Sequence, residues 1–126
     1  MARKKSPHLT DAELRLMEVI WRKGRATVSD VVEGLPKDAR VAYSTVLTLL
    51  RILENKGYLK HTKEGRAFVY SPAVERQTAR ESALRHLLRR FFDDSPELLM
   101  LTLLDPKKTG AKELARLRKR IEEEKP

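Results

Sequence analysis

Cysteine is absent from the 126 residues of this chain. Its absence excludes disulfides, thiolate metal sites and cysteine nucleophiles, and it agrees with a reducing compartment. No apolar run approaches the roughly 18 residues that span a membrane. The first residues, Met1 to Lys5, are basic but are not followed by the apolar segment of a secretory signal. We therefore expect a cytoplasmic protein that does not insert into a membrane.

Signatures of catalysis are also missing. The sequence has no Gly-rich phosphate loop, no HExxH and no GxSxG pattern. Its three histidines, His8, His61 and His86, are scattered. The neighbouring Asp93 and Asp94 fall at a predicted helix end, where carboxylates are usually solvated. The sequence thus predicts a protein that is not an enzyme and that needs no cofactor or metal ion.

An excess of positive charge is what the sequence does have. The formal net charge is +9 and the pI is near 10.0. Residues 1–72 hold 14 Lys and Arg against 8 Asp and Glu, a net +6, and residues 73–126 hold 13 against 10, a net +3. A basic balance favours polyanionic partners, although lysine-rich surfaces are common on soluble proteins. Charge alone therefore leaves nucleic acid and an ordinary basic surface as equal alternatives.

The first helix of the chain is expected to start at Thr10. Thr10 and Glu13 have the spacing of a capping box, in which each side chain accepts a hydrogen bond from the other residue's backbone. Gly24 is the expected end of this helix. Its apolar stripe consists of Leu14, Met17, Val19, Ile20 and Trp21. The stripe is broad, which predicts a helix buried along one face.

Two more helices are predicted before residue 57. After a short β-prone stretch at 26–28, Ser29 is the expected N-cap of a short helix over 30–33. A third helix is expected over 43–56, ending at Gly57. Val46, Leu49, Leu50 and Leu53 have the i, i+3, i+4, i+7 spacing of a core-facing stripe in this third helix.

A β-hairpin is expected to follow. Two β-prone runs, 58–62 and 67–70, flank a turn that contains Gly65, and Pro72 ends the second run. Residues 9–72 therefore run helix, short strand, helix, helix, hairpin. This is the order of a winged helix-turn-helix, and it predicts a mostly α fold with a small β-hairpin.

From residue 73 onward only helices are expected. A long amphipathic helix comes first, Ser95 and Pro96 start the next, and a last helix opens at Thr109 or Gly110. The apolar positions assigned to a dimer interface are Leu84, Leu87, Leu88, Phe91, Leu98, Leu99, Leu101, Leu103, Leu117 and Ile121. The alternative for them is an ordinary core within one chain. The expected organisation is thus a basic arm over 1–8, a winged-helix DNA-binding domain over 9–72 and a helical dimerisation domain over 73–126.

The outer face of the third helix carries the candidate chemistry. Ser44, Thr45, Thr48, Arg51 and Asn55 lie away from its apolar stripe and offer hydroxyl, guanidinium and amide groups. Such groups meet base edges and phosphates in a major groove, although on an isolated helix a solvated face would be the simpler interpretation. Within a winged helix this face enters the groove. Lys63 and Arg66 at the hairpin tip would then form the wing and reach a neighbouring phosphate.

Functions of another class remain open at this point. The same fold serves protein-interaction and RNA-binding modules that do not read duplex sequence. An effector-binding sensor would need a pocket with convergent polar groups, and the C-terminal segment offers few.

Three segments resemble the BlaI/MecI/CopY family of penicillinase-type repressors. Residues 9–14 (LTDAEL), followed by Val19-Ile20-Trp21, resemble its opening. Residues 43–51 (YSTVLTLLR) and 53–59 (LENKGYL) resemble its recognition helix, and 64–70 (EGRAFVY) resemble its wing. The resemblance covers nearly all of residues 8–72, and the tail agrees mainly in helical character and length.

This resemblance implies a repressor that binds dyad-symmetric operator DNA as a homodimer. The genes repressed by such proteins serve β-lactam resistance or copper handling. The family's base-reading hydroxyls correspond to Thr45 and Thr48, with Ser44 and Arg51 as neighbouring contacts. Together with the two cations of the hairpin tip, the predicted DNA-binding set is Tyr43, Ser44, Thr45, Thr48, Arg51, Lys63 and Arg66. Ile52 departs from the family, which often has arginine there. Arg51 points about 100° away from that position around the helix.

Two departures concern regulation. The CopY branch senses copper through C-terminal cysteines, and this chain has none. In the β-lactam branch a membrane sensor-protease, an indirect partner, triggers cleavage at an Asn–Phe bond in the dimerisation domain. The similar stretch here contains Thr102 and Leu103 instead. The resemblance thus places a candidate cleavage region at Thr102-Leu103 without the family's preferred pair.

Overall fold

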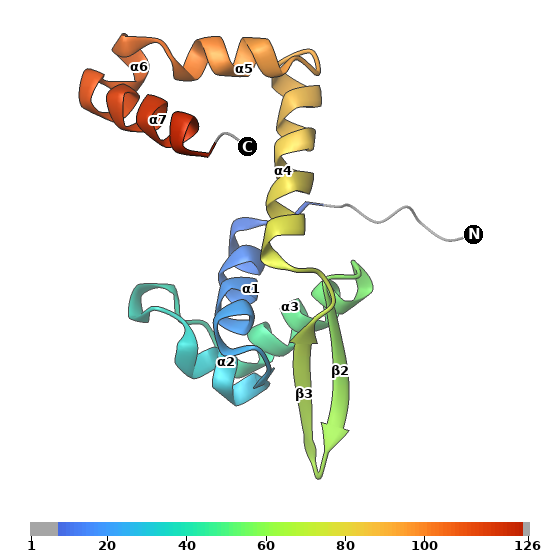
Figure 1. Ribbon diagram of the computed structural model, residues 1–126. Helices are drawn as coiled ribbons and strands as arrows, with labels where there is room; N and C mark the ends of the chain where they lie inside the picture. The colour runs from blue at the N-terminus through green and yellow to red at the C-terminus, as the bar shows by residue number, and fades with distance from the viewer. Residues whose placement is uncertain (1–7, 125–126) are drawn as a thin grey trace. The chain divides into compact units, whose positions relative to one another are not determined.

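The computed structural model describes residues 8–124, so the predicted basic arm lies, apart from His8, outside the described residues. Its first part is the expected winged helix (Figure 1). The elements in chain order are α1 (Asp11–Lys23), β1 (Ala26–Thr27), α2 (Val28–Gly34), the 3-10 helix η1 (Lys37–Ala39), α3 (Tyr43–Asn55), β2 (Leu59–Glu64) and β3 (Ala67–Pro72).

α1 begins with the predicted capping box. The Thr10 hydroxyl accepts a hydrogen bond from the Glu13 backbone N–H at 3.1 Å, and Glu13 Oε1 accepts one from the Thr10 N–H at 2.8 Å. Gly24 ends the helix with a φ of +87°, which glycine adopts without strain. The predicted apolar stripe of α1 was wrong at one position. Leu14, which was expected to be buried, is 39% exposed, and Leu16 is buried instead. Leu14 lies at the edge of the buried face.

The N-cap of α2 is Thr27, so the assignment of this cap to Ser29 was wrong. The Thr27 hydroxyl accepts from the Asp30 N–H at 3.1 Å, and the Asp30 carboxylate accepts from the Thr27 N–H at 3.0 Å. These bonds hold the pKa of Asp30 below its usual value. A capping box at Ser29 would need an acceptor side chain three residues later, and that residue is Val32, which has none. The helix therefore starts two residues earlier than expected.

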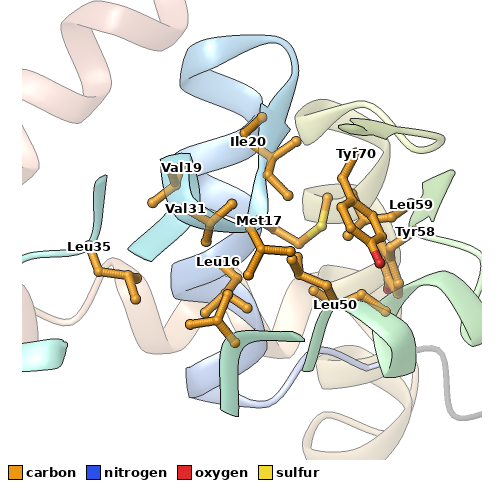
Figure 2. Packing of buried hydrophobic residues seen from close by; sticks show 14 of the residues in the cluster. Leu16, Met17, Val19, Ile20, Val31, Leu35, Leu50, Tyr58, Leu59 and Tyr70 are labelled. Carbon is orange, nitrogen blue, oxygen red and sulfur yellow. The ribbon is translucent and has the colours of Figure 1, made fainter. Parts of the chain in front are cut away.

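The core of the winged helix lies between the three helices and the sheet (Figure 2). Met17 and Ile20 of α1 are fully buried, as are Val31 of α2 and Leu50 of α3. Tyr70 closes the cluster on the side of the sheet, where Figure 2 shows it beside Leu59 and Tyr58. This core fixes which face of α3 points outward.

The sheet has the strand order β1-β3-β2 and is antiparallel throughout. β2 and β3 pair from Leu59↔Pro72 to Glu64↔Ala67, so the hairpin is longer than predicted and its turn consists of Gly65 and Arg66 alone. Gly65 has a φ of +64°, as two-residue hairpin turns require at their first position. The hairpin extends beyond the helices that support it (Figure 1).

The segment after β3 is held on α1. Trp21 Nε1 donates to the Val74 carbonyl oxygen at 2.9 Å, and the Arg76 guanidinium lies 5.5 Å from the centre of the Trp21 ring. Ala79 of α4 (Arg76–Phe91) is buried in the same core as α1. The chain divides into two compact units that meet between Ser82 and Ala83, inside α4. The division at 72/73 expected from the sequence stays a prediction.

The second unit contains the remainder of α4 and three further helices. These are α5 (Pro96–Leu103), α6 (Pro106–Thr109) and α7 (Ala111–Glu123). Ser95 caps α5 by accepting from the Leu98 N–H at 3.2 Å, as predicted, whereas the one-turn helix α6 was not predicted. Within residues 8–124, no helix is long and apolar enough to cross a membrane.

Candidate nucleic-acid interface

The outer face of α3 is defined by what its inner face buries. Val46, Leu50 and Leu53 have no exposed surface, and Leu49 is half-buried against them. The opposite face presents Ser44, Thr45, Thr48, Arg51 and Asn55, all of them exposed. The structure therefore brings together the predicted hydroxyl, guanidinium and amide groups on one side of one helix.

The N-terminus of α3 is open and electropositive. Its N-cap residue, Ala42, has no side chain that accepts from the first-turn N–H groups, and no acidic residue occupies the first turn. The partial positive charge of the helix end is therefore not neutralised locally, which suits a nearby phosphate. Tyr43 stands at this end with 53% of its surface exposed.

The Thr48 hydroxyl has a defined orientation. It donates to the Ser44 carbonyl oxygen, one turn earlier, at 3.0 Å. Its proton is thus used inside the helix, and its oxygen lone pairs and methyl group remain for a partner. An acceptor oxygen beside a methyl group suits the amino groups of adenine or cytosine and the methyl group of thymine.

The turn before α3 is held by Arg40. Its Nε donates to the Leu35 carbonyl oxygen at 3.3 Å, and one terminal nitrogen donates to the Glu33 carbonyl oxygen at 3.1 Å. These bonds satisfy carbonyls at the end of α2, where the helix leaves acceptors unpaired. Arg40 therefore fixes the connection between α2 and α3 rather than offering a free cation.

The wing places its cations at the hairpin tip. Arg66 lies in the two-residue turn and Lys63 opposes Phe68 across the strands, and all three are exposed. Glu64 forms an ion pair with Arg25, which precedes β1. No pattern in the sequence indicates this pair, because its members are separated by 39 residues.

Arg51 lies close enough to Tyr70, a buried residue of β3, to influence its hydroxyl group electrostatically. Burial raises the pKa of Tyr70 in β3, with a smaller contribution from Glu54 in the same direction, while Arg51 acts to lower it. Ile52, the departure from the family pattern, is also exposed on α3, at 38%. The helix thus exposes an apolar side chain at the position after Arg51, about 100° away around the helix.

The remaining predicted residues all lie in the helices from α4 to α7. Leu84, Leu87, Phe91, Leu98, Leu101, Leu103 and Ile121 are exposed, and Leu88, Leu99 and Leu117 are half-buried. Thr102 is exposed within α5, and its hydroxyl donates to the Leu98 carbonyl oxygen at 3.0 Å. No group of three or more His, Cys, Asp or Glu side chains that could hold a metal ion occurs within residues 8–124.

Comparison with known proteins agrees with this fold. A family model described as penicillinase repressor matches residues 9–123. The chain belongs to the penicillinase repressor family. The penicillinase repressor of Bacillus licheniformis is 34% identical to it over 122 residues, which are 97% of this chain and 95% of that protein. The methicillin resistance regulatory protein MecI of Staphylococcus aureus strain N315 is 22% identical over 114 residues, 90% of this chain and 93% of MecI.

Solved structures support the family assignment. The DNA-binding domain of the repressor BlaI is similar with a TM-score of 0.52 and 39% identity, covering 60% of this chain and 93% of that domain. The monomeric form of Bacillus licheniformis BlaI in complex with the blaP half-operator gives a TM-score of 0.50, also with 39% identity and the same coverage. The predictions of the family and of the winged-helix fold are thus confirmed.

Proposed function

We propose that this penicillinase-repressor family member is a cytoplasmic transcriptional repressor that binds a dyad-symmetric DNA operator as a homodimer. The observation that carries the proposal is the outer face of α3, where Ser44, Thr45 and Thr48 are exposed opposite fully buried Val46 and Leu50. A relative with this fold has been solved on a half-operator. By analogy, this face of α3 reads bases in the major groove.

The proposed DNA-binding residues divide into two roles. The first two turns of α3 are the part of a recognition helix that contacts base edges, and they contain Tyr43, Ser44, Thr45 and Thr48. Arg51, Lys63 and Arg66 are exposed cations that bind the phosphate backbone. The base contacts select the sequence, and the phosphate contacts supply affinity that depends on salt.

The exposed apolar side chains of the second unit support a dimer. Leu114 is buried there, whereas Phe91 is 67% and Leu101 66% exposed. A unit of this size buries too little apolar surface to be stable alone, and large exposed apolar patches on soluble proteins mark interfaces. A second copy that covers these side chains would place two recognition helices about 34 Å apart, one turn of DNA.

The proposed targets follow from the relatives. Proteins named penicillinase repressor and methicillin resistance regulatory protein suggest that this chain represses genes of β-lactam resistance or of a related stress response. Induction by a membrane sensor-protease that leads to cleavage near Thr102 and Leu103 stays a prediction. Both residues are exposed, but they lie within or at the end of α5.

Selection from a random duplex pool tests the proposal. Full-length protein should enrich an inverted repeat and bind it about 10³-fold or more tightly than a scrambled duplex. If the dimer neutralises about 6–10 phosphates, raising the salt concentration from 50 to 200 mM should lower its affinity about 10³- to 10⁵-fold. Equal affinity for selected duplex, scrambled duplex and structured RNA would contradict the proposal and favour an RNA-binding module. A chain that binds none of these nucleic acids would instead favour a protein-interaction module.

A further inference from the structure

His61 joins the wing to the recognition helix. Its Nδ1 lies 2.8 Å from both Oε1 and Oε2 of Glu54, which is in the last turn of α3. His61 is the third residue of β2 and is paired with Tyr70 of β3. The two elements that would contact DNA are therefore connected by a direct side-chain interaction.

The aromatic residues of β3 hold the imidazole in place. The His61 ring centre is 4.9 Å from that of Phe68 and 5.5 Å from that of Tyr70, with tilted planes. Side chains on a strand alternate between its faces, so His61 and Lys63 share one face of β2. A shift of His61 would consequently move the Lys63 ammonium relative to α3.

The charges around the pair are of both signs. Glu54 is the carboxylate in contact with the imidazole, Arg51 lies one turn earlier on α3, and Lys63 follows two residues later on β2. The side chains of His61 and Glu54 are 36% and 32% exposed, so water weakens their attraction without removing it. An imidazolium would be held by Glu54 more strongly than a neutral ring.

The wing has few other attachments. Residues 60–68 are all exposed, so beyond the strand pairing its position depends on side-chain contacts. The Arg25–Glu64 ion pair lies on the opposite face of β2, because Glu64 is an odd number of residues from His61. On the face of β2 that it shares with Lys63, His61 contacts Glu54 of α3, and this contact lies two residues from Lys63 along the strand.

We propose that His61 and Glu54 are positioning residues that set the wing against α3 and make the wing's contribution to DNA binding depend on pH. This inference rests on the proposed function. Histidine gains its charge between about pH 8 and pH 5. At the lower pH the charged pair holds Lys63 and Arg66 toward the phosphates, and as the pH rises the pair weakens and the wing is less well placed.

The test measures binding of the full-length protein to a fixed duplex of arbitrary sequence between pH 6 and pH 8 by fluorescence anisotropy. Such a duplex reports phosphate contacts and does not require the operator to be known. As the pH rises from 6 to 8, the affinity of the wild type should fall about 2- to 5-fold per protomer, which is the size of effect expected from an exposed ion pair. His61→Gln and Glu54→Gln should both flatten this response. His86→Gln, a matched change at another histidine, should leave it unchanged.

A second comparison separates positioning from a general loss of structure. A Lys63→Ala/Arg66→Ala background lacks both cations at the tip of the wing, which are the ones His61 is proposed to place. His61→Gln should therefore have no further effect on affinity in that background. A wild-type pH response in His61→Gln, or an equal loss in both backgrounds at every pH, would overturn the inference while leaving the proposed function intact. A wild type that binds no duplex even at pH 6 would overturn both.

Discussion

Glu13 shows how one residue connects distant parts of the winged helix. It is 3% exposed, and its Oε1 accepts from the Thr10 N–H and from Lys56 Nζ, the latter at 2.8 Å. Lys56 Nζ also donates to the His8 carbonyl oxygen at 3.0 Å. The start of α1 is thereby tied to the end of α3. Burial alone would raise the pKa of Glu13, but the bonds from Lys56 and Thr10 outweigh it and the pKa is lowered.

A lowered pKa has a defined consequence for stability. A carboxylate whose pKa falls on folding stabilises the protein above its unfolded pKa, and this contribution is lost as the pH falls through the folded value. Lys56→Met should therefore cost about 1–3 kcal/mol at pH 7, because it leaves a buried carboxylate without its cation. The difference from the wild type should shrink as the pH falls below the usual value of 4.5. Urea unfolding at pH 7 and pH 3.5 measures both quantities.

Lys60→Met is the matched control, because Lys60 is an exposed lysine of β2. It should change the free energy of unfolding by less than about 0.5 kcal/mol at either pH. A Lys56→Met penalty that is as large at pH 3.5 as at pH 7 would show that lost packing, and not the ion pair, accounts for it.

Residue-level polar contacts were predictable only where they were local. The spacing of Thr10 and Glu13 revealed the capping box, since both partners lie within one turn. Lys56 contacts Glu13 across 43 residues, and no pattern in the sequence connects them. The same limit applies to Arg25 with Glu64 and, at the junction of α3 and β2, to Glu54 with His61. These contacts depend on how the elements pack in the tertiary structure, so local sequence patterns do not reveal them.

At the scale of elements, the close approach of α2 to α1 depends on Gly34. A Cβ added at this position would lie 2.6 Å from Val19 Cγ1, and Val19 is itself buried. Alanine favours a helix by about 1 kcal/mol over glycine, but overpacking of a buried contact costs about 1–3 kcal/mol. Gly34→Ala should therefore lower the free energy of unfolding overall, as measured by urea titration.

A double-mutant cycle isolates that clash. Val19→Ala removes the methyl group that the new Cβ would meet, so Gly34→Ala should cost less in the Val19→Ala background than in the wild type. Glu33→Ala, at the exposed neighbouring position of α2, should be close to neutral. Equal costs of Gly34→Ala in both backgrounds would contradict the steric explanation.

Element types were largely readable from the sequence, and the errors have physical causes. The apolar spacing of Val46, Leu50 and Leu53 predicted both α3 and its outward face, because burial and periodicity have the same source. The two hairpin strands were predicted too short, since their pairing extends up to the turn in β2 and as far as Pro72 in β3. The cap of α2 was misplaced because Ser29, a residue type that favours N-caps, lies two positions after the actual cap, Thr27.

At the scale of the whole molecule, the exposed apolar side chains of the second unit predict a dimer. Wild-type protein, 14.6 kDa as a single chain, should sediment at twice that mass at micromolar concentration. Leu101→Asp should shift it to monomer, because a carboxylate in an apolar interface is costly to bury. Lys108→Asp, an exposed position in α6, should remain dimeric. A wild type that stays monomeric, alone and on DNA, would contradict the dimer.

The central claim is that the outer face of α3 reads sequence while the wing binds the backbone. The most direct measurement is the ratio of affinities for the selected duplex and a scrambled one, determined for Thr48→Glu and Arg66→Ala. Thr48→Glu should bring the ratio close to one, because it replaces an acceptor and methyl group with a bulky charge. Arg66→Ala should weaken both complexes equally, keep the ratio and reduce the salt slope by about one per protomer, or about two for the dimer. A Thr48→Glu protein that retains the wild-type ratio would contradict the claim.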